Sequence, residues 1–141
     1  MSDVMRRNAR GFTLLEVMIA MVIVAILAAV AYPSYIRHVQ DARRNEAKTA
    51  LLDTANRLER CFTEHYSYQA DSCPSGSFSV GDYYTLTIAT PSASKYRLEA
   101  SPKAGSAQAG DRCGTLILDQ TGQRDLENTS DATDGASCGW Q

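Results

Sequence analysis

Apolar and polar positions follow three different patterns along this chain. An uncharged run covers 17–31 and belongs to a longer apolar stretch, 12–35, in which Glu16 is the one charged residue. Further along, apolar residues recur at steps of three or four, which is the period of one buried helix face. They are Ala47, Leu51, Ala55, Leu58 and Phe62. Because no glycine interrupts 12–66, the pattern predicts a long helix, apolar in its first half and amphipathic in its second.

The other face of the amphipathic half is charged and is predicted to face solvent. It carries Arg37, Asp41, Arg44, Lys48, Asp53 and Arg60. Pro33 lies between the two halves, where its ring removes one backbone donor and clashes with the preceding turn. We expect a kink near 29–32; the alternative is that the first helix ends at Pro33 and a second begins at Ser34.

Short segments after the helix predict strands, and apolar and polar residues alternate in the first two. They cover 82–88, 95–100 and 114–119, with a short fourth strand at 123–126. The composition of 66–77 is typical of a loop, and 90–94 is predicted as a turn. Short connections predict an antiparallel meander whose apolar face packs on the helix stripe. The expected fold class is therefore α+β, a long N-terminal helix on an antiparallel β-sheet of about four strands.

The apolar stretch is long enough to cross a membrane only if it includes its acid. As a helix, 17–31 would rise about 22 Å, which is less than the roughly 30 Å of bilayer hydrocarbon, whereas 12–35 would rise about 35 Å. A carboxylate in lipid costs several kcal/mol unless it finds a partner. Glu16 is therefore a candidate functional residue.

The charge pattern favours membrane targeting and argues against nucleic-acid binding. Arg6, Arg7 and Arg10 outweigh Asp3 ahead of the apolar stretch, which is the positive flank that stays cytoplasmic. The net charge is −2; residues 1–11 hold three Arg and one Asp, so without them the side chains sum to −4. A nucleic-acid binder usually has a basic face, and no nucleic-acid partner is predicted.

Four cysteines, an even number, predict two disulfides in an oxidising compartment. They are Cys61, Cys73, Cys113 and Cys138. Three pairings are possible, and Cys61 with Cys73 and Cys113 with Cys138 is favoured because each closes a local loop. A zinc site that uses Cys61, His65 and Cys73 is a weaker alternative, since no fourth ligand is evident.

The segment Gly11-Phe12-Thr13-Leu14-Leu15-Glu16, followed by an apolar helix, resembles the class III leader and N-terminus of type IV pilins and pseudopilins. The resemblance implies the type IV pilin fold, cleavage after Gly11 by a prepilin peptidase, and N-methylation of Phe12. It also implies that Glu16 sets subunit register in a filament and that Pro33 kinks the helix. The implied organisation is a cleaved leader at 1–11, a transmembrane and filament-core half-helix at 12–34, and a periplasmic globular region at 35–141.

A second resemblance covers roughly 61–140 and is to the PilE-type minor pilins. It rests on the Tyr83-Tyr84 strand, Gln108 and Asp111 before Cys113, a Leu-Ile-Leu-Asp strand, Gly122 and Cys138-Gly139-Trp140. It implies a minor pilin that helps initiate the pilus or enters it, with roles in adhesion and twitching motility. The implied partners are other pilins through the N-terminal helix, the prepilin peptidase, the inner-membrane assembly platform and the membrane. The precursor would lie in the bacterial inner membrane and later enter the pilus.

Four further interpretations are weighed against this one, and the first is a major pilin. A type II secretion pseudopilin shares every N-terminal feature, and a secreted soluble domain would follow from signal-peptidase cleavage before Tyr32. Four acids in the tail are candidate calcium ligands, although their spacing matches no regular calcium loop. They are Asp125, Glu127, Asp131 and Asp134. His38 and His65 have no serine or cysteine nucleophile arranged with them, so we predict no enzymatic activity. We also predict no cofactor and no metal site.

Overall fold

The structure is a computed structural model and describes residues 11–129 and 135–140. It divides into an N-terminal unit, Met1–Arg37, and a second unit, His38–Gln141, which we call the head. Helix α1, Leu14–His65, contributes its first part to the N-terminal unit and its second part to the head. The other elements, all in the head, are β1 (Gly76–Val80), β2 (Tyr84–Ser92), β3 (Lys95–Pro102), β4 (Thr115–Asp119), β5 (Arg124–Glu127) and α2 (Gly135–Cys138).

Helix α1 continues through Pro33, so the alternative of two helices separated at this residue is wrong. A proline removes one backbone donor, and the neighbouring turns keep their own hydrogen bonds. The Pro33 carbonyl also accepts a hydrogen bond from Arg37 Nε at 3.3 Å. The kink expected near 29–32 stays a prediction.

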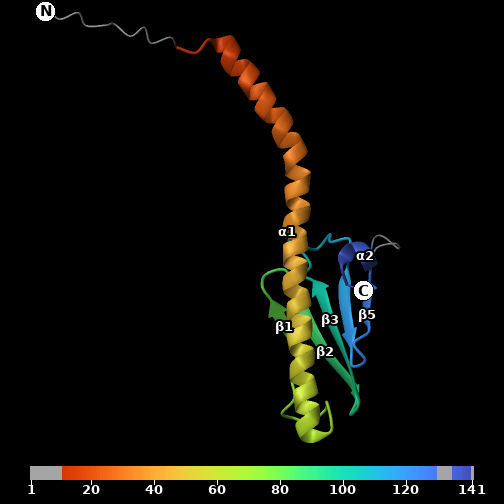
Figure 1. The fold of residues 1–141 in the computed structure, drawn as a ribbon. Helices are drawn as coiled ribbons and strands as arrows, with labels where there is room; N and C mark the ends of the chain where they lie inside the picture. The colour runs from red at the N-terminus through yellow and green to blue at the C-terminus, as the bar shows by residue number, and fades with distance from the viewer. Residues whose placement is uncertain (1–10, 130–134, 141) are drawn as a thin grey trace, which may run out of the picture. The chain divides into compact units, whose positions relative to one another are not determined.

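The head contains one sheet with the order β1-β2-β3-β4-β5, and every neighbouring pair is antiparallel. This is the predicted meander, and α1 crosses one face of it (Figure 1). Leu51 and Leu58 of α1 belong to the same buried cluster as Leu86, Leu98 and Leu116, and all five are 0% exposed. Each such leucine contributes about 1.5–3 kcal/mol through burial, which explains why the predicted helix stripe lies against the sheet.

The sheet has five strands, and the strand that we did not predict is β1. Its sequence, Gly-Ser-Phe-Ser-Val, resembles a loop because glycine and serine are common in turns. The structure pairs it with β2, with Phe78 opposite Leu86 and Val80 opposite Tyr84. As an edge strand, β1 has one neighbour and only Val80 is buried, so the apolar signal in its sequence is weak.

Strand β2 also extends further than predicted, to Ser92, through a segment that we expected to be a turn. Its pairing with β3 is irregular between Ala89 and Ser92, the interval that contains Pro91. Proline is tolerated in a strand at such an irregularity because no ladder hydrogen bond requires its missing N–H. The turn into β3 is therefore only two residues long, 93–94.

Gly114 allows the start of β4 to approach the end of β5. Its φ is +58°, and a Cβ at this position would lie 2.3 Å from Glu127 O and 2.7 Å from Asn128 O. Gly122 has a similar φ of +79° but open space around it. Substitutions at these two glycines therefore separate the cost of a left-handed backbone from the cost of steric crowding.

We expect Gly114→Ala to lower the free energy of unfolding by about 2–5 kcal/mol, the sum of left-handed strain and overpacking. Gly122→Ala should lower it by only about 1–2 kcal/mol. The fluorescence of Trp140, the single tryptophan and 1% exposed, reports unfolding of the head in urea. Equal effects of the two substitutions would show that crowding at Gly114 is unimportant.

Candidate assembly site

Thr13 caps the first turn of α1. Its Oγ1 accepts a hydrogen bond from the backbone N of Glu16 at 3.2 Å, and its carbonyl accepts one from the backbone N of Val17 at 3.2 Å. Thr-x-x-Glu is the capping-box pattern, in which the acid returns a bond to the cap residue's N–H. The cap fixes the start of the helix two residues after Phe12.

The carboxylate of Glu16 does not return that bond. Within residues 11–129 and 135–140 it has no hydrogen-bond or ion-pair partner. It lies at an open groove on the helix, which we call the N-terminal groove, with a volume of 450 Å³. The groove is lined by Phe12, Glu16, Val17, Ala20, Met21 and Val24. An acid therefore lies on an apolar surface with its oxygens available to a partner.

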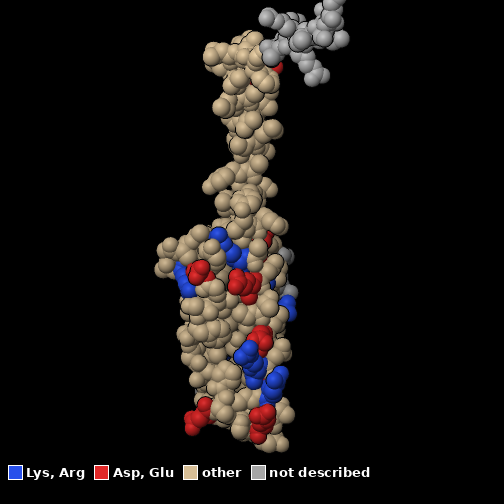
Figure 2. Space-filling model, turned by 90° about the vertical axis from the view of Figure 1, so that its left-hand side faces the viewer, with Lys and Arg blue, Asp and Glu red and all other residues tan. Residues whose placement is uncertain are grey.

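The N-terminal unit exposes its apolar side chains on all sides. From Phe12 (83% exposed) to Ile36 (38% exposed), no large apolar residue is buried. Charged side chains of both signs are visible over the head in Figure 2, whereas Glu16 is the one charged residue between Phe12 and Ile36. The first part of α1 is long and apolar enough to cross a membrane. Such a surface requires lipid or other apolar helices around it.

The predicted site residues fall into separate groups. Gly11 and Phe12 directly precede α1, and Glu16 lies in its first turn, so these three are neighbours. Pro33 lies farther along the same helix, and the four cysteines all belong to the head. Phe12 and Glu16 both line the N-terminal groove.

The head contains two disulfides, Cys61–Cys73 and Cys113–Cys138, with Cα–Cα distances of 5.6 and 5.9 Å. This is the favoured pairing, and it makes the zinc alternative wrong because neither Cys61 nor Cys73 has a free thiolate. The second bridge attaches α2, a short helix that we did not predict. Lys48 Nζ donates to Cys138 O at 2.6 Å, and Trp140 Nε1 donates to Ile117 O at 2.8 Å. The tail is therefore held to both α1 and the sheet.

A buried ion pair joins α1 to the loop before β4. Arg44 and Asp111 have side chains only 3% and 0% exposed. Arg44 Nε lies 3.1 Å from Asp111 Oδ2, and Arg44 Nη2 lies 2.5 Å from Asp111 Oδ1. Arg44 also contacts Asp41 at 2.7 Å. Two parallel bonds of this kind are the strongest form of arginine–carboxylate contact.

Neutral groups complete the hydrogen bonding of Asp111. Tyr84 OH donates to Asp111 Oδ2 at 2.8 Å, and Gln108 Nε2 donates to the same oxygen at 3.0 Å. Gln108 Nε2 also lies 3.3 Å from the carbonyl of Gln40 on α1. The buried network therefore connects α1, β2 and the loop before β4.

The network shifts the pKa values of its members in opposite directions. Burial alone would raise the pKa of Asp111, but hydrogen bonds from Arg44 and Tyr84 outweigh it and hold that pKa below its usual value. Burial and the adjacent Asp111 raise the pKa of Tyr84. Asp111 is thus ionised and Tyr84 is neutral near neutral pH.

We predicted Arg44 on the solvent face, and this is wrong. Its position precedes Ala47 by three residues and Leu51 by seven, so the helical period alone places it on the buried stripe. We placed Arg44 on the solvent face because it is charged. A charged side chain is buried only with a partner, and the partner of Arg44 lies far along the chain. Gln108 and Asp111 carried the minor-pilin resemblance, but the sequence did not indicate their contact with Arg44.

The candidate calcium ligands lie only partly within the described residues. Asp125 and Glu127 belong to β5, whereas Asp131 and Asp134 lie outside the described residues. In the part of the chain that the structure describes, no group of three metal-binding side chains is present.

Two family profiles match the sequence. The family described as "Type IV minor pilin ComP, DNA uptake sequence receptor" matches residues 33–117, and the prokaryotic N-terminal methylation motif matches residues 6–32. The first match covers more than half of the chain and includes Arg44, Gln108 and Asp111. The second includes Gly11, Phe12 and Glu16.

Individual relatives agree with these profiles. The type IV wide pilus major component PilA4 of Thermus thermophilus is 33% identical over 104 residues, 71% of this chain and 79% of that protein. The type II secretion system protein I of Pseudomonas aeruginosa is 47% identical over 53 residues, 37% of this chain and 41% of that protein. The type IV major pilin PilA of Myxococcus xanthus is 41% identical over 59 residues. This match covers 42% of this chain but only 27% of that protein.

A solved structure has the same fold. A type IV pilin from Shewanella oneidensis superposes with a TM-score of 0.52 and 30% sequence identity. The superposition covers 67% of this chain and 94% of that chain. The long helix on an antiparallel meander is thus common to both proteins.

Proposed function

Because the chain belongs to the type IV pilin family, we propose that it is a minor pilin that helps initiate the pilus or is incorporated into it. Residues 1–11 are the leader, 12–34 form the transmembrane and filament-core half of the helix, and 35–141 form the globular region. The work of such a protein is assembly. Adhesion and twitching motility are functions of the resulting pilus.

The observation that carries the assembly role is the unpartnered carboxylate of Glu16 on an exposed apolar helix. Cleavage after Gly11 creates an amine on Phe12, four residues before Glu16. In a filament, the carboxylate of one subunit pairs with the Phe12 amine of its neighbour. In an environment of low dielectric constant this attraction is much stronger than in water, and it sets the register between subunits.

The apolar surface of the N-terminal unit supports the same pathway. In the precursor this surface contacts lipid, and in the filament it contacts the equivalent helices of other pilins. The partners are therefore other pilins, the prepilin peptidase that removes the leader, and the inner-membrane assembly platform. The globular region lies in the periplasm before assembly and at the cell surface afterwards.

Gly11→Val tests the processing step. A β-branched side chain at the cleavage position should block the peptidase, so the protein should accumulate as a precursor that retains residues 1–11. Ala9→Val enlarges a leader residue and should be processed normally. Intact mass spectrometry of membrane fractions distinguishes the two forms, and normal cleavage of Gly11→Val would overturn the assignment.

A type II secretion pseudopilin is the second candidate, favoured by the match to type II secretion system protein I. Both classes share the N-terminal motif, so the head and the assembly partner must distinguish them. Sheared pili that contain this chain support the minor-pilin proposal. Loss of protein secretion with intact pili on deletion would favour the pseudopilin.

We do not extend the DNA-receptor role in the family description to this chain. Without residues 1–11 the side chains sum to −4. Arg44, Arg57 and Arg97 of the head are each paired with carboxylates. Binding to the phosphate backbone is driven by lysine and arginine side chains that neutralise phosphates, and the face drawn in Figure 2 carries charges of both signs.

A further inference from the structure

Strand β1 forms an open edge of the sheet. It pairs with β2 on one side, and within residues 11–129 and 135–140 its backbone makes no hydrogen bond on the other side. Figure 1 shows β1 at one edge of the sheet, beside α1. The N–H and C=O groups along such an edge are available to another strand.

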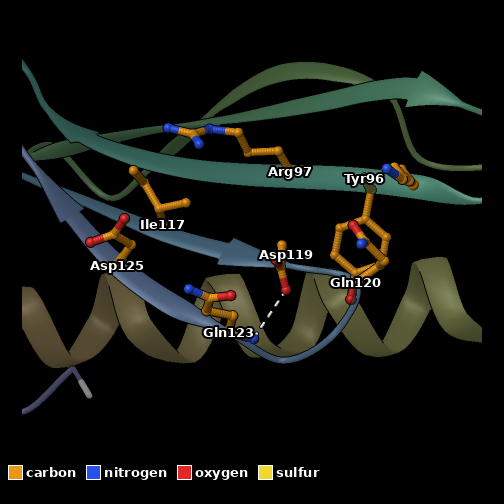
Figure 3. A pocket seen from close by; sticks show the side chains of 8 residues that line it. Tyr96, Arg97, Ile117, Asp119, Gln120, Gln123 and Asp125 are labelled. Carbon is orange, nitrogen blue, oxygen red and sulfur yellow. Dashed lines mark hydrogen bonds between the residues drawn. The ribbon is translucent and has the colours of Figure 1, made fainter.

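Natural sheet edges are often protected against such pairing by charged residues, proline or a bulge. Strand β1, Gly76–Val80, has no charged residue and no proline, and it pairs with β2 without a register shift. The opposite edge strand, β5, is Arg-Asp-Leu-Glu and carries three charges in four residues. Figure 3 shows Asp125 of β5 in a polar region that also contains Asp119 and Gln123. The unprotected edge is therefore β1.

The sequence of β1 is symmetric about its central residue, because Ser77-Phe78-Ser79 reads the same in both directions. Two copies of β1 can pair antiparallel about a two-fold axis that passes perpendicular to the sheet at Phe78. Phe78, which is 44% exposed in one copy, then faces Phe78 of the other copy, and Ser77 faces Ser79. Aromatic pairs and hydroxyl pairs that face each other across strands stabilise a sheet.

Two charged residues of α1 lie at opposite ends of β1. Arg57 and Pro74 line a groove of 180 Å³ between α1 and β1, so Arg57 lies near the start of the strand. A carboxylate oxygen of Glu46 lies 3.0 Å from the position of a Cβ on Gly81, so Glu46 lies near the end of the strand. In the part of the chain that the structure describes, the Glu46 carboxylate has no hydrogen-bond or ion-pair partner.

The two-fold axis makes these charges complementary. Rotation about it exchanges the two ends of β1, so Glu46 of each copy lies on the side of Arg57 of the other copy. Pairing of β1 with β5 would leave a free edge on each copy and would continue into an open array, whereas the two-fold pairing closes. We propose that two copies of this chain pair through β1 and form a two-fold dimer of heads.

This dimer contact goes beyond the proposed assembly role. The axis makes the α1 segments of the two heads antiparallel, whereas subunits that repeat head to tail along one filament all have the same direction. The inference therefore stands whether or not the chain is a minor pilin.

Disulfide trapping tests the register of the pairing. Full chains with Ser77→Cys are mixed in detergent with full chains that carry Ser79→Cys, under mild oxidation. Facing residues of antiparallel strands have Cα atoms about 4.5–5.5 Å apart, within the range of a disulfide, so this mixed pair should cross-link. Two Ser77→Cys chains should cross-link about tenfold more slowly, because diagonal residues are roughly 7–8 Å apart.

Sedimentation velocity of the full chain in the same detergent measures the dimer itself. Ser79→Lys adds a charge to the edge and should raise the dissociation constant about tenfold or more. Ala109→Lys adds the same charge at an exposed residue of the loop before β4 and should leave the constant unchanged. Urea titration followed through Trp140 fluorescence verifies that the head of each variant is folded.

A charge exchange tests the contact between α1 segments. Glu46→Arg should weaken the dimer, because it places two arginines on the same side of the interface. Adding Arg57→Glu to the same chain should restore the dissociation constant to within about threefold of the wild type, since opposite charges then face each other again.

Four results would overturn the proposal. The chain could remain monomeric at every soluble concentration, or Ser79→Lys and Ala109→Lys could have equal effects, which would place the contact in the N-terminal unit. Ser77→Cys could cross-link to itself as fast as to Ser79→Cys. Finally, the charge exchange could fail to restore the dimer, which would exclude the axis at Phe78.

Discussion

Replacing Asp111 by alanine will lower the free energy of unfolding of the head by about 3–5 kcal/mol. The substitution leaves the Arg44 guanidinium buried without its main partner, and an uncompensated buried charge is strongly destabilising. It also removes the acceptor for Tyr84 OH and for Gln108 Nε2. Urea titration of the full chain, followed through Trp140 fluorescence, measures the loss.

Two controls separate the buried pair from charge removal in general. Asp53→Ala breaks the exposed Asp53–Arg57 pair, whose side chains are 59% and 67% exposed, and should change stability by no more than about 0.5 kcal/mol. Arg44→Met with Asp111→Leu removes both charges and keeps the volume, so it should lose much less than Asp111→Ala. If Asp111→Ala and Asp53→Ala had equal effects, the buried pair would not stabilise the head.

Because the pKa of Asp111 is lowered, the Arg44–Asp111 contact makes the stability of the head depend on pH. A carboxyl whose pKa is lower in the folded state than in the unfolded state stabilises the fold. For Asp111 this stabilisation is complete above the unfolded pKa of 3.8, and it is lost as the pH falls through the folded pKa. The wild type should therefore lose stability below about pH 4. Asp111→Asn should show a smaller decrease over that window.

Glu16→Gln will exclude the protein from filaments while leaving its processing unchanged. Glutamine keeps the shape of the side chain but cannot neutralise an amine, so each subunit would add an unpaired charge to an apolar interior. We expect at least a tenfold decrease of the protein in sheared pili relative to its amount in membranes. Quantitative mass spectrometry of the two fractions measures this ratio.

Val24→Ala is the matched control, because Val24 also lines the N-terminal groove. It removes apolar volume without changing charge, so incorporation should decrease by less than about threefold, which corresponds to under 1 kcal/mol. Normal incorporation of Glu16→Gln would remove the carboxylate from the assembly mechanism.

The parts of the fold that follow a strong period were predictable from the sequence. The stripe from Ala47 to Leu58 has the helical period, and it is buried as expected. The alternation in β3 likewise placed that strand correctly, and β4 lies within one residue of its predicted bounds. Weak or conflicting local signals account for the misses: β1 is rich in glycine and serine, and β2 contains Pro91.

The candidate assembly site was predictable because its residues are adjacent in sequence. Gly11, Phe12 and Glu16 lie within six residues, so no tertiary contact is needed to bring them together. The Arg44–Asp111 pair spans 67 residues. It depends on how the loop before β4 packs against α1, which a single sequence does not specify.

The central claim, that this chain is a pilin subunit processed between Gly11 and Phe12, is tested most directly by the N-terminal peptide of the protein recovered from whole cultures, with the sheared pili, the membranes and the medium analysed separately. We predict a chain that begins at Phe12 and carries an N-terminal methyl group. A chain that begins at Tyr32 would contradict the account, because it would lack Glu16 and would be a soluble secreted domain.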